Sequence, residues 1–147
     1  MNIAIIGLGY WGKNYLRILS SNDRVKLSAV VEPTQNIKLE EEIKQFFNLE
    51  DLLNSEITID AAVICTPTNT HYEITRKLLN SGIHVLVEKP LATKSAEAKD
   101  LLEIAYKNNL TLLVDHTFLY NEAINFAIKQ IHDGAVSYTH LRAHETS

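Results

Sequence analysis

Cysteine is almost absent from this chain of 147 residues, which contains Cys65 and no other. A single cysteine excludes a disulfide within the chain and a metal cluster held by several thiolates. Long hydrophobic runs are lacking too: no segment approaches the roughly 20 apolar residues that span a bilayer, and no basic stretch precedes the first apolar run, as it does in a secretory signal. These absences predict a reducing, cytoplasmic setting, with no membrane partner and no metal.

Positive charge is also in short supply. The 14 Lys and Arg residues face 18 Asp and Glu residues, so the formal net charge is −4. Without a basic field, a nucleic-acid partner is not expected. The apolar content of 46% is ordinary for a globular protein, and the length suffices for one domain with a sizeable core. The composition therefore favours a globular domain with a small-molecule ligand.

Glycine is scarce, yet three of the five glycines form Gly-x-Gly-x-x-Gly at Gly7, Gly9 and Gly12, between an apolar run and a helical pattern. In a dinucleotide site, the first glycine permits the tight turn and the second lets a pyrophosphate approach the backbone. The third lets the new helix pack closely on its strand, and the helix start directs free N–H groups at the phosphates. An ordinary glycine-rich turn is the alternative.

Short apolar runs alternate with amphipathic segments along the rest of the chain. Continuously apolar strands that alternate with helices predict an α/β domain with a doubly wound parallel sheet, whose ligands bind at the carboxyl ends of the strands. We predict strands at residues 2–6, 25–31, 60–65, 83–87 and 110–114. We predict helices at 10–21, 37–47, 49–53, 71–81, 95–108 and 118–132, with Ser95 as an N-cap and Gly82 as a glycine that ends a helix.

Glu32 ends the second predicted strand, twenty residues after Gly12, where a dinucleotide site places an acid for the adenosine ribose hydroxyls. The same carboxylate would repel the extra phosphate of NADP, by about 1 kcal/mol per charge pair at ~4 Å in water and about 4 at an intermediate dielectric. The next basic residue is Lys38. We therefore predict NAD in preference to NADP; a solvated turn residue is the alternative.

Two further stretches follow strand ends. The hydroxyls and amide of residues 66–71 are placed to line a cofactor cleft, while Thr68 or Asn69 could also cap a helix. Glu88-Lys89-Pro90 holds a lysine on a stiff backbone, because Pro90 fixes its own φ and restricts the residue before it. A partly desolvated lysine serves as an acid, a base or a donor. An exposed turn lysine is equally consistent with this position.

Four stretches, in this order, resemble the amino-terminal domain of the glucose–fructose oxidoreductase / inositol dehydrogenase (Gfo/Idh/MocA) family. They are Gly-Leu-Gly-Tyr-Trp-Gly-Lys-Asn, Thr-Pro-Thr-Asn-Thr-His, Val-Glu-Lys-Pro-Leu and Asp-His-Thr-Phe-Leu-Tyr-Asn. The resemblance covers residues 1–134 and implies a Rossmann-like domain. Members of the family are NAD(P)-dependent oxidoreductases of sugars, cyclitols and related polyols, and the first and last stretches resemble members that oxidise nucleotide-linked sugars.

The resemblance also implies roles for individual residues. The glycine turn would hold the pyrophosphate, Glu32 the adenosine ribose, and Lys89 both the nicotinamide side and the substrate; Pro90 is often cis in this family. The residues implied along the cofactor are Gly7, Gly9, Tyr10, Trp11, Gly12, Glu32, Thr66, Pro67, Asn69, His71, Glu88 and Lys89, and those implied to face the nicotinamide or the substrate are Asp115, His116 and Asn121.

The family has a second domain for which this chain has no room. That domain supplies much of the sugar pocket, the main oligomer interface and a histidine that acts with the lysine, so the intact enzyme is expected to be a homo-oligomer. Residues 136–146 match the peptide encoded by a transposon-based sequencing-library adapter. We therefore expect a dinucleotide-binding domain at 1–134 and a non-native tail at 135–147, in which His140 and His144 are not a metal pair.

The sequence thus predicts the NAD-binding part of an oxidoreductase that transfers hydride between a secondary alcohol of a sugar or nucleotide sugar and nicotinamide. This chain alone is not expected to turn over. A non-catalytic NAD-binding regulatory module is one alternative, although it has little need of Lys89. An S-adenosylmethionine methyltransferase is another, and it leaves Glu88-Lys89-Pro90 unexplained.

Overall fold

The computed structural model describes residues 1–34 and 37–135 and divides the chain into two units. The first unit is Met1–Asp115, and the second begins at His116. The stretch interpreted above as adapter-encoded, with His140 and His144, lies outside the described residues apart from Ala135. Within the described ranges, none of the helices is long and apolar enough to cross a membrane.

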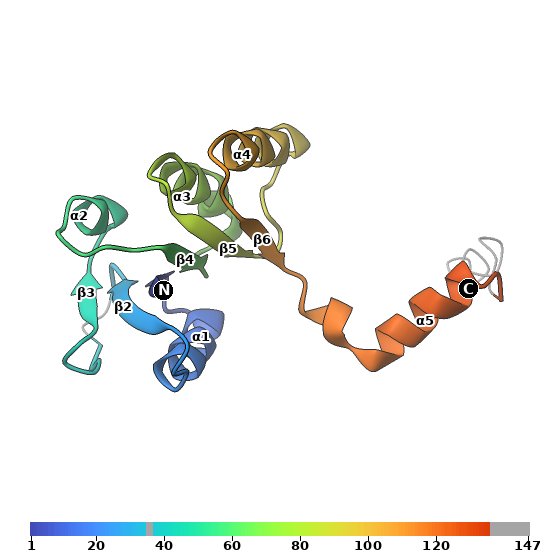
Figure 1. Ribbon diagram of the computed structural model, residues 1–147, viewed down its shortest axis with the longest axis horizontal. Helices are drawn as coiled ribbons and strands as arrows, with labels where there is room; N and C mark the ends of the chain where they lie inside the picture. Colours follow the sequence, from blue (N-terminus) through green and yellow to red (C-terminus); the bar gives the residue numbers. More distant parts are fainter. Residues whose placement is uncertain (35–36, 136–147) are drawn as a thin grey trace. The chain divides into compact units, whose positions relative to one another are not determined.

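The first unit is built on a six-stranded sheet, and every strand pair in it is parallel (Figure 1). The strand order is β3-β2-β1-β4-β5-β6, so the chain crosses from one edge to the centre between β3 and β4. This confirms the predicted doubly wound parallel sheet. The strands are β1 (Asn2–Ile6), β2 (Lys26–Val31), β3 (Lys44–Phe46), β4 (Ala61–Ile64), β5 (His84–Glu88) and β6 (Leu112–Asp115).

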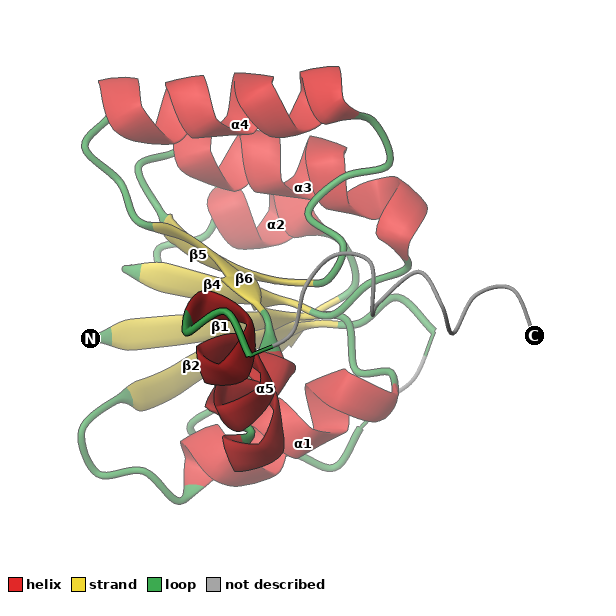
Figure 2. Ribbon diagram, turned by 90° about the vertical axis from the view of Figure 1, so that its right-hand side faces the viewer, coloured by secondary structure: helices red, strands yellow, loops and turns green. Residues whose placement is uncertain are grey.

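Helices cover both faces of this sheet, as Figure 2 shows: α2, α3 and α4 lie on one face and α1 on the other. Because the central strands are covered on both sides, Ile5, Val30 and Ile64 are fully buried. Leu78 and Leu101, also fully buried, extend the core from α3 and α4. The helices are α1 (Tyr10–Ser20), α2 (Leu49–Leu53), α3 (Thr68–Asn80) and α4 (Ser95–Lys107).

The helix predicted over residues 37–47 is wrong. Residues 37–43 contain no helix, and β3 occupies the end of this stretch, in register with β2 from Ala29↔Lys44 to Val31↔Phe46. The backbone N–H of Glu32 also donates to the Phe46 carbonyl, at 2.9 Å. Apolar residues in this segment have helical spacing. The open edge of β2 offers backbone hydrogen bonds to the segment, and local periodicity carries no information about such a distant partner.

The residues considered as helix caps from the sequence do not cap α3 or α4. Helix α3 begins at Thr68 itself, after Pro67, and no side chain caps it, so neither Thr68 nor Asn69 has the predicted capping role. Helix α4 follows Lys94, and Ser95 is its first residue rather than its N-cap. In both cases the residue before the polar side chain, Pro67 or Lys94, occupies the N-cap position, which shifts the boundary of the helix.

The end of α3 matches its prediction. Gly82 follows the helix with φ of +78°, its N–H donates to the Leu79 carbonyl at 3.2 Å, and the Ile83 N–H donates to the Leu78 carbonyl at 3.0 Å. This left-handed conformation is one that glycine adopts without strain.

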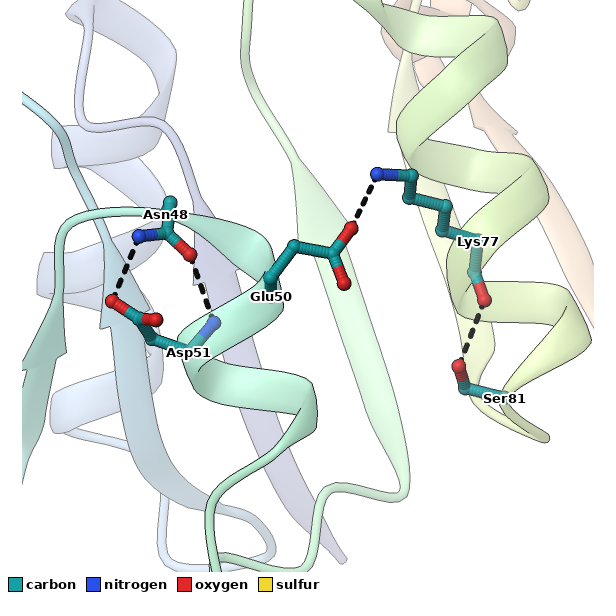
Figure 3. A network of polar contacts seen from close by, with 5 residues as sticks. All are labelled: Asn48, Glu50, Asp51, Lys77 and Ser81. Atoms are coloured by element: carbon teal, nitrogen blue, oxygen red, sulfur yellow. Dashed lines mark hydrogen bonds and ion pairs between the residues drawn. The ribbon is translucent and has the colours of Figure 1, made fainter.

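Polar contacts join the short helix α2 to α3, as Figure 3 shows. Asn48 caps α2 by accepting the Asp51 N–H at 2.8 Å, and its amide donates to the Asp51 carboxylate at 2.7 Å. Glu50 forms an ion pair with Lys77 of α3. At the end of that helix, the Ser81 hydroxyl donates to the Lys77 carbonyl at 2.9 Å. Of these exposed contacts, the Glu50–Lys77 ion pair is the one that joins the two helices.

The second unit contains the 3-10 helix η1 (Thr117–Tyr120) and helix α5 (Glu122–His132). The single helix predicted over residues 118–132 is therefore interrupted at Asn121. The Asn121 side chain accepts the backbone N–H groups of Ala123 at 3.0 Å and Ile124 at 3.3 Å, and its own backbone is extended. Asparagine readily forms such local bonds, and here they start a new helix.

Thr75 of α3 provides a stability prediction, because its buried hydroxyl has no hydrogen-bond partner among the described residues. Thr75→Val removes this unpaired group and keeps the shape, so we expect the free energy of unfolding to rise by about 1 kcal/mol. Urea unfolding measures the change. Thr70→Val is the matched control: the Thr70 hydroxyl lies 2.7 Å from both the Thr66 hydroxyl and the Pro67 carbonyl, so this variant should lose stability. A destabilised Thr75→Val would contradict the prediction.

Candidate functional site

The carboxyl ends of the parallel strands meet at one edge of the sheet, where the predicted site residues of the first unit follow them. The glycine turn follows β1, Glu32 follows β2, and Thr66 comes two residues after the end of β4. Glu88 ends β5 and Asp115 ends β6. In sheets of this kind, ligands bind beyond the carboxyl ends of the strands, next to the switch in strand order. The candidate site is therefore this edge of the first unit.

Gly7 and Gly12 have the packing roles that the sequence predicts. Gly7 has φ of +90°, and a Cβ there would lie 2.9 Å from the Thr66 methyl group and 3.1 Å from the Cys65 carbonyl. A Cβ on Gly12 would lie 2.1 Å from the Gly7 carbonyl oxygen. Both positions therefore require glycine, and Gly12 brings α1 directly against the turn.

Gly9 differs from its two neighbours in the motif. A Cβ on Gly9 would meet only the Cys65 carbonyl oxygen, at 4.0 Å, so protein packing does not require glycine there. Gly9 occupies the N-cap position of α1, no side chain caps this helix, and its first turn contains no acidic residue. The exposed rings of Tyr10 and Trp11 follow it in sequence and make an edge-to-face contact with each other, with centroids 5.4 Å apart. An uncapped helix start with open space over a glycine suits an anionic ligand.

Glu32 is buried beside the glycine turn, with 8% of its surface exposed. One carboxylate oxygen accepts the Leu8 N–H at 2.8 Å, and the other accepts the Thr34 N–H at 3.0 Å and the Thr34 hydroxyl at 2.6 Å. Burial by itself would raise the pKa of Glu32, but these three bonds and the charge of Lys13 outweigh it and lower the pKa. The acid is thus a fixed carboxylate rather than the solvated turn residue of the alternative interpretation.

A hollow of about 350 Å³ opens between the ends of β1, β2 and β4. Gly7, Val31, Pro33 and Thr66 contribute to it, and Phe47 and Leu49 form part of its lining next to α2. The lining is mostly apolar, and two of its residues, Val31 and Pro33, are the sequence neighbours of Glu32. Such a hollow suits a flat aromatic group whose attached sugar lies at the carboxylate.

His71 lies in the interior rather than on the surface of the site, with 1% of its surface exposed. Its Nδ1 is 2.8 Å from the Pro90 carbonyl oxygen, and its Nε2 is 2.8 Å from the Thr66 carbonyl oxygen. A neutral imidazole has one N–H, so it donates to one of these carbonyls at a time, and both bonds form together only when the ring has two protons. His71 ties the loop after β4 to the loop after β5 through its ring, while Asn69 near it is exposed.

Lys89 and Pro90 follow β5 and are exposed, and the peptide bond between them is cis, as the family resemblance implied. Of the two environments that the sequence left open for Lys89, partly desolvated or exposed, the first unit has the exposed one. Glu88 is buried, with 8% of its surface exposed. Burial, followed by the negative charge of Asp115, raises its pKa against the opposing effect of Lys89.

Tyr15 is a site residue that the sequence interpretation missed. It lies on α1, three residues after Gly12, and its hydroxyl donates to the Asp115 carboxylate. Burial, reinforced by Asp115, raises its pKa, so the phenol stays protonated. The sequence did contain a signal for this position. Tyr15 follows Gly12 by three residues, and residues at that spacing share one helix face, so Tyr15 lies on the face of α1 that packs against the sheet.

His116 and Asn121 belong to the second unit and have local backbone roles there. The His116 carbonyl accepts the Leu119 N–H at 2.9 Å, and the Asn121 side chain caps α5.

A larger hollow of about 410 Å³ lies on the sheet face of the first unit, but Met1, Ala61, His84 and Thr111 place it toward the amino ends of the strands. We therefore do not assign the candidate site to it. Among the described residues, no group of three His, Cys, Asp or Glu side chains is placed to hold a metal ion.

Comparisons with known proteins bear on this site. The family described as "Oxidoreductase family, NAD-binding Rossmann fold" (Gfo/Idh/MocA) matches residues 1–116. The chain is 25% identical over 138 residues to 2,7-anhydro-N-acetylneuraminate hydratase of Escherichia coli. This match covers 92% of this chain and 37% of that protein. It is 26% identical to UDP-N-acetylglucosamine 3-dehydrogenase of Acidithiobacillus ferrooxidans, covering 94% and 44%.

A solved structure shares the fold. GenD2 from gentamicin A biosynthesis, crystallised in complex with NAD, is 26% identical with a TM-score of 0.72, and the match covers 82% of this chain and 35% of that one. The chain thus spans well under half the length of each of these relatives. The matched family model covers the glycine turn, Glu32 and Lys89 together. By sequence and by fold, this chain belongs to the Gfo/Idh/MocA oxidoreductase family and contains its NAD-binding Rossmann domain.

Proposed function

We propose that this chain is the cofactor-binding part of an oxidoreductase that moves hydride between nicotinamide and a secondary alcohol of a sugar or nucleotide sugar. The observation that carries the proposal is the uncapped glycine turn with the fixed Glu32 carboxylate beside it. The relatives named for acting on UDP-N-acetylglucosamine and on an anhydro-neuraminate support a sugar substrate. The remainder of the intact enzyme, a homo-oligomer in this proposal, would supply most of the sugar pocket.

The cofactor would lie along the carboxyl edge of the sheet, and the strand order sets its direction. The pyrophosphate would rest on the N–H groups at the start of α1, over Gly9. Glu32 stands on the β2 side of β1, so the adenosine half points toward β2, with its base in the apolar hollow. The nicotinamide half then extends the other way, over β4, β5 and β6, past Thr66 and Asn69.

Lys89 follows β5 on that nicotinamide side. Its exposed Nζ is free to reach a substrate hydroxyl, hold it in hydrogen-bond contact and take or return its proton while nicotinamide supplies the hydride acceptor or donor. His71 would keep the carbonyls of Thr66 and Pro90 in place on either side of the ring. This division of roles makes Lys89 the catalytic residue and the glycine turn the anchor.

We infer a preference for NAD over NADP from the environment of Glu32. Its carboxylate is held by three hydrogen bonds and remains charged, so it favours ribose hydroxyls and repels a phosphate in their place. The one base that contributes to its electrostatics, Lys13, lies on α1 and is already balanced by this carboxylate.

Titration of the chain with NADH and NADPH, followed by nicotinamide fluorescence, tests the proposal. We expect NADH to bind at least about fivefold more tightly than NADPH, because the repulsion lies between about 1 and 4 kcal/mol. Glu32→Gln should weaken NADH binding and reduce the difference between the NADH and NADPH affinities, because the substitution removes the negative charge. Glu97→Gln, a carboxylate on α4 paired with Lys94, is the control and should change neither affinity. Tighter binding of NADPH by the unaltered chain would overturn the preference, and binding of S-adenosylmethionine alone would overturn the proposed function.

A further inference from the structure

Two carboxylates stand side by side at the carboxyl edge of the sheet. Glu88 and Asp115 are register partners at the ends of the parallel strands β5 and β6. Neighbouring strands are about 4.8 Å apart, and residues paired in register project to the same face of a sheet. Glu88 is buried and Asp115 half-buried. This is a paired carboxylate site of which the hydride transfer proposed above makes no use.

Three other titratable groups lie near the pair: one on α1, one after β4, and one directly after Glu88. Tyr15 of α1 donates its hydroxyl to Asp115, so it stabilises a charge on that residue. Cys65, after β4, has its pKa raised to about 12 by burial and by the two carboxylates, so the thiol is neutral. Lys89, next to Glu88 in the chain, is the nearby cation and is exposed.

Two carboxylates at neighbouring register positions, partly buried, disfavour simultaneous ionisation. The Tyr15 donor selects Asp115 as the charged partner, because a hydroxyl bond stabilises a carboxylate. Glu88 is the more buried of the two, which disfavours its charged form. Its raised pKa agrees with this assignment.

We propose that Glu88 and Asp115 hold one proton between them, with the charge on Asp115, and that this single negative charge forms a subsite for the cationic nicotinamide ring of NAD⁺. The second half rests on the proposed function, which places the nicotinamide over β5 and β6. The ring of NAD⁺ has one positive charge that the ring of NADH lacks. The pair therefore binds the oxidised cofactor more tightly than a neutral edge would.

The sign of the pH dependence follows. As the pH rises through the titration of Glu88, the pair goes from one negative charge to two and favours NAD⁺ further. Binding of NAD⁺ should in turn release part of a proton, because the cation favours the ionised pair.

The shared proton is tested without any cofactor, by following the Glu88 carboxyl carbon with ¹³C NMR during a pH titration of the chain. We expect its midpoint to lie above that of an ordinary glutamate and to fall in Asp115→Asn. Asp100→Asn is the matched control, because Asp100 also accepts a tyrosine hydroxyl, from Tyr72 at 2.9 Å, but lies on α4 away from Glu88. A Glu88 midpoint that is ordinary and the same in Asp115→Asn would overturn the shared proton.

The subsite is tested by the ratio of the dissociation constants of NADH and NAD⁺, measured by calorimetry. The double variant Glu88→Gln, Asp115→Asn removes the charge, and we expect the ratio to fall roughly tenfold, as one charge pair of intermediate strength predicts. In Glu88→Gln alone the ratio should lose its dependence on pH. An unchanged ratio in the double variant overturns the subsite while leaving the proposed function intact. If neither cofactor form binds the unaltered chain, the proposed function and the subsite fail together, and the shared proton is decided by NMR alone.

Discussion

We expect Gly12→Ala to lower the free energy of unfolding of this chain by about 3 kcal/mol or more, at the upper end of the cost of overpacking. The new Cβ would lie 2.1 Å from the Gly7 carbonyl oxygen and 3.0 Å from its carbon, and both are backbone atoms that cannot rotate away. Gly7 is itself fixed, because its N–H donates to the Val31 carbonyl at 2.8 Å. Relief therefore requires α1 to move away from the sheet. Urea unfolding followed by circular dichroism measures the loss.

Gly9→Ala is the matched control, and it separates packing from binding within one motif. Its Cβ would meet only the Cys65 carbonyl oxygen, at an ordinary 4.0 Å. We expect stability to fall by no more than about 1 kcal/mol, because alanine is a poorer helix N-cap than glycine. If the two variants were equally stable, the account of Gly12 as a packing glycine would be wrong.

The second large effect concerns Lys89 and is measured in the complete protein that contains this domain. We expect Lys89→Met to lower kcat by a factor of about 10²–10⁴, the range that proton transfer by a positioned side chain contributes. The affinity for NADH should change little, because the cofactor is held mainly by the glycine turn and Glu32. Steady-state kinetics and an NADH titration on the same sample give both values.

Lys94→Met is the control for this experiment. Lys94 lies five residues further along, before α4, is exposed like Lys89, and pairs with Glu97 at 3.1 Å. It should leave kcat unchanged. Full turnover in Lys89→Met would remove the lysine from the chemistry and favour the regulatory interpretation, in which NAD binds without reaction.

Sequence patterns predicted the parts of this fold that depend on local chemistry. The glycine turn, the β4 and β5 strands and the end of α3 at Gly82 each have a signal in adjacent residues: apolar runs, or a glycine where φ must be positive. Glu32 was found by its spacing from the glycines. The structure adds that its carboxylate is fixed by Leu8 and Thr34.

The parts that could not be predicted depend on contacts between distant residues. Strand β3 forms because β2 offers a free edge, which outweighs the helical spacing of residues 37–47. The Tyr15 hydroxyl reaches Asp115, a hundred residues away in sequence, and His71 joins two loops through its ring. No local pattern reports such pairs. The exposure of Lys89 likewise depends on which side chains surround it in space.

The central claim is that the carboxyl edge of this sheet binds NAD(H) through the glycine turn. It is tested most directly by calorimetric titration of NADH into the unaltered chain and into Gly9→Ala, the variant whose fold the geometry leaves intact. The account predicts saturable binding of one NADH to the unaltered chain and a loss of at least roughly tenfold in Gly9→Ala, because its methyl group occupies the approach to the backbone. Equal NADH affinity in the two proteins would contradict it.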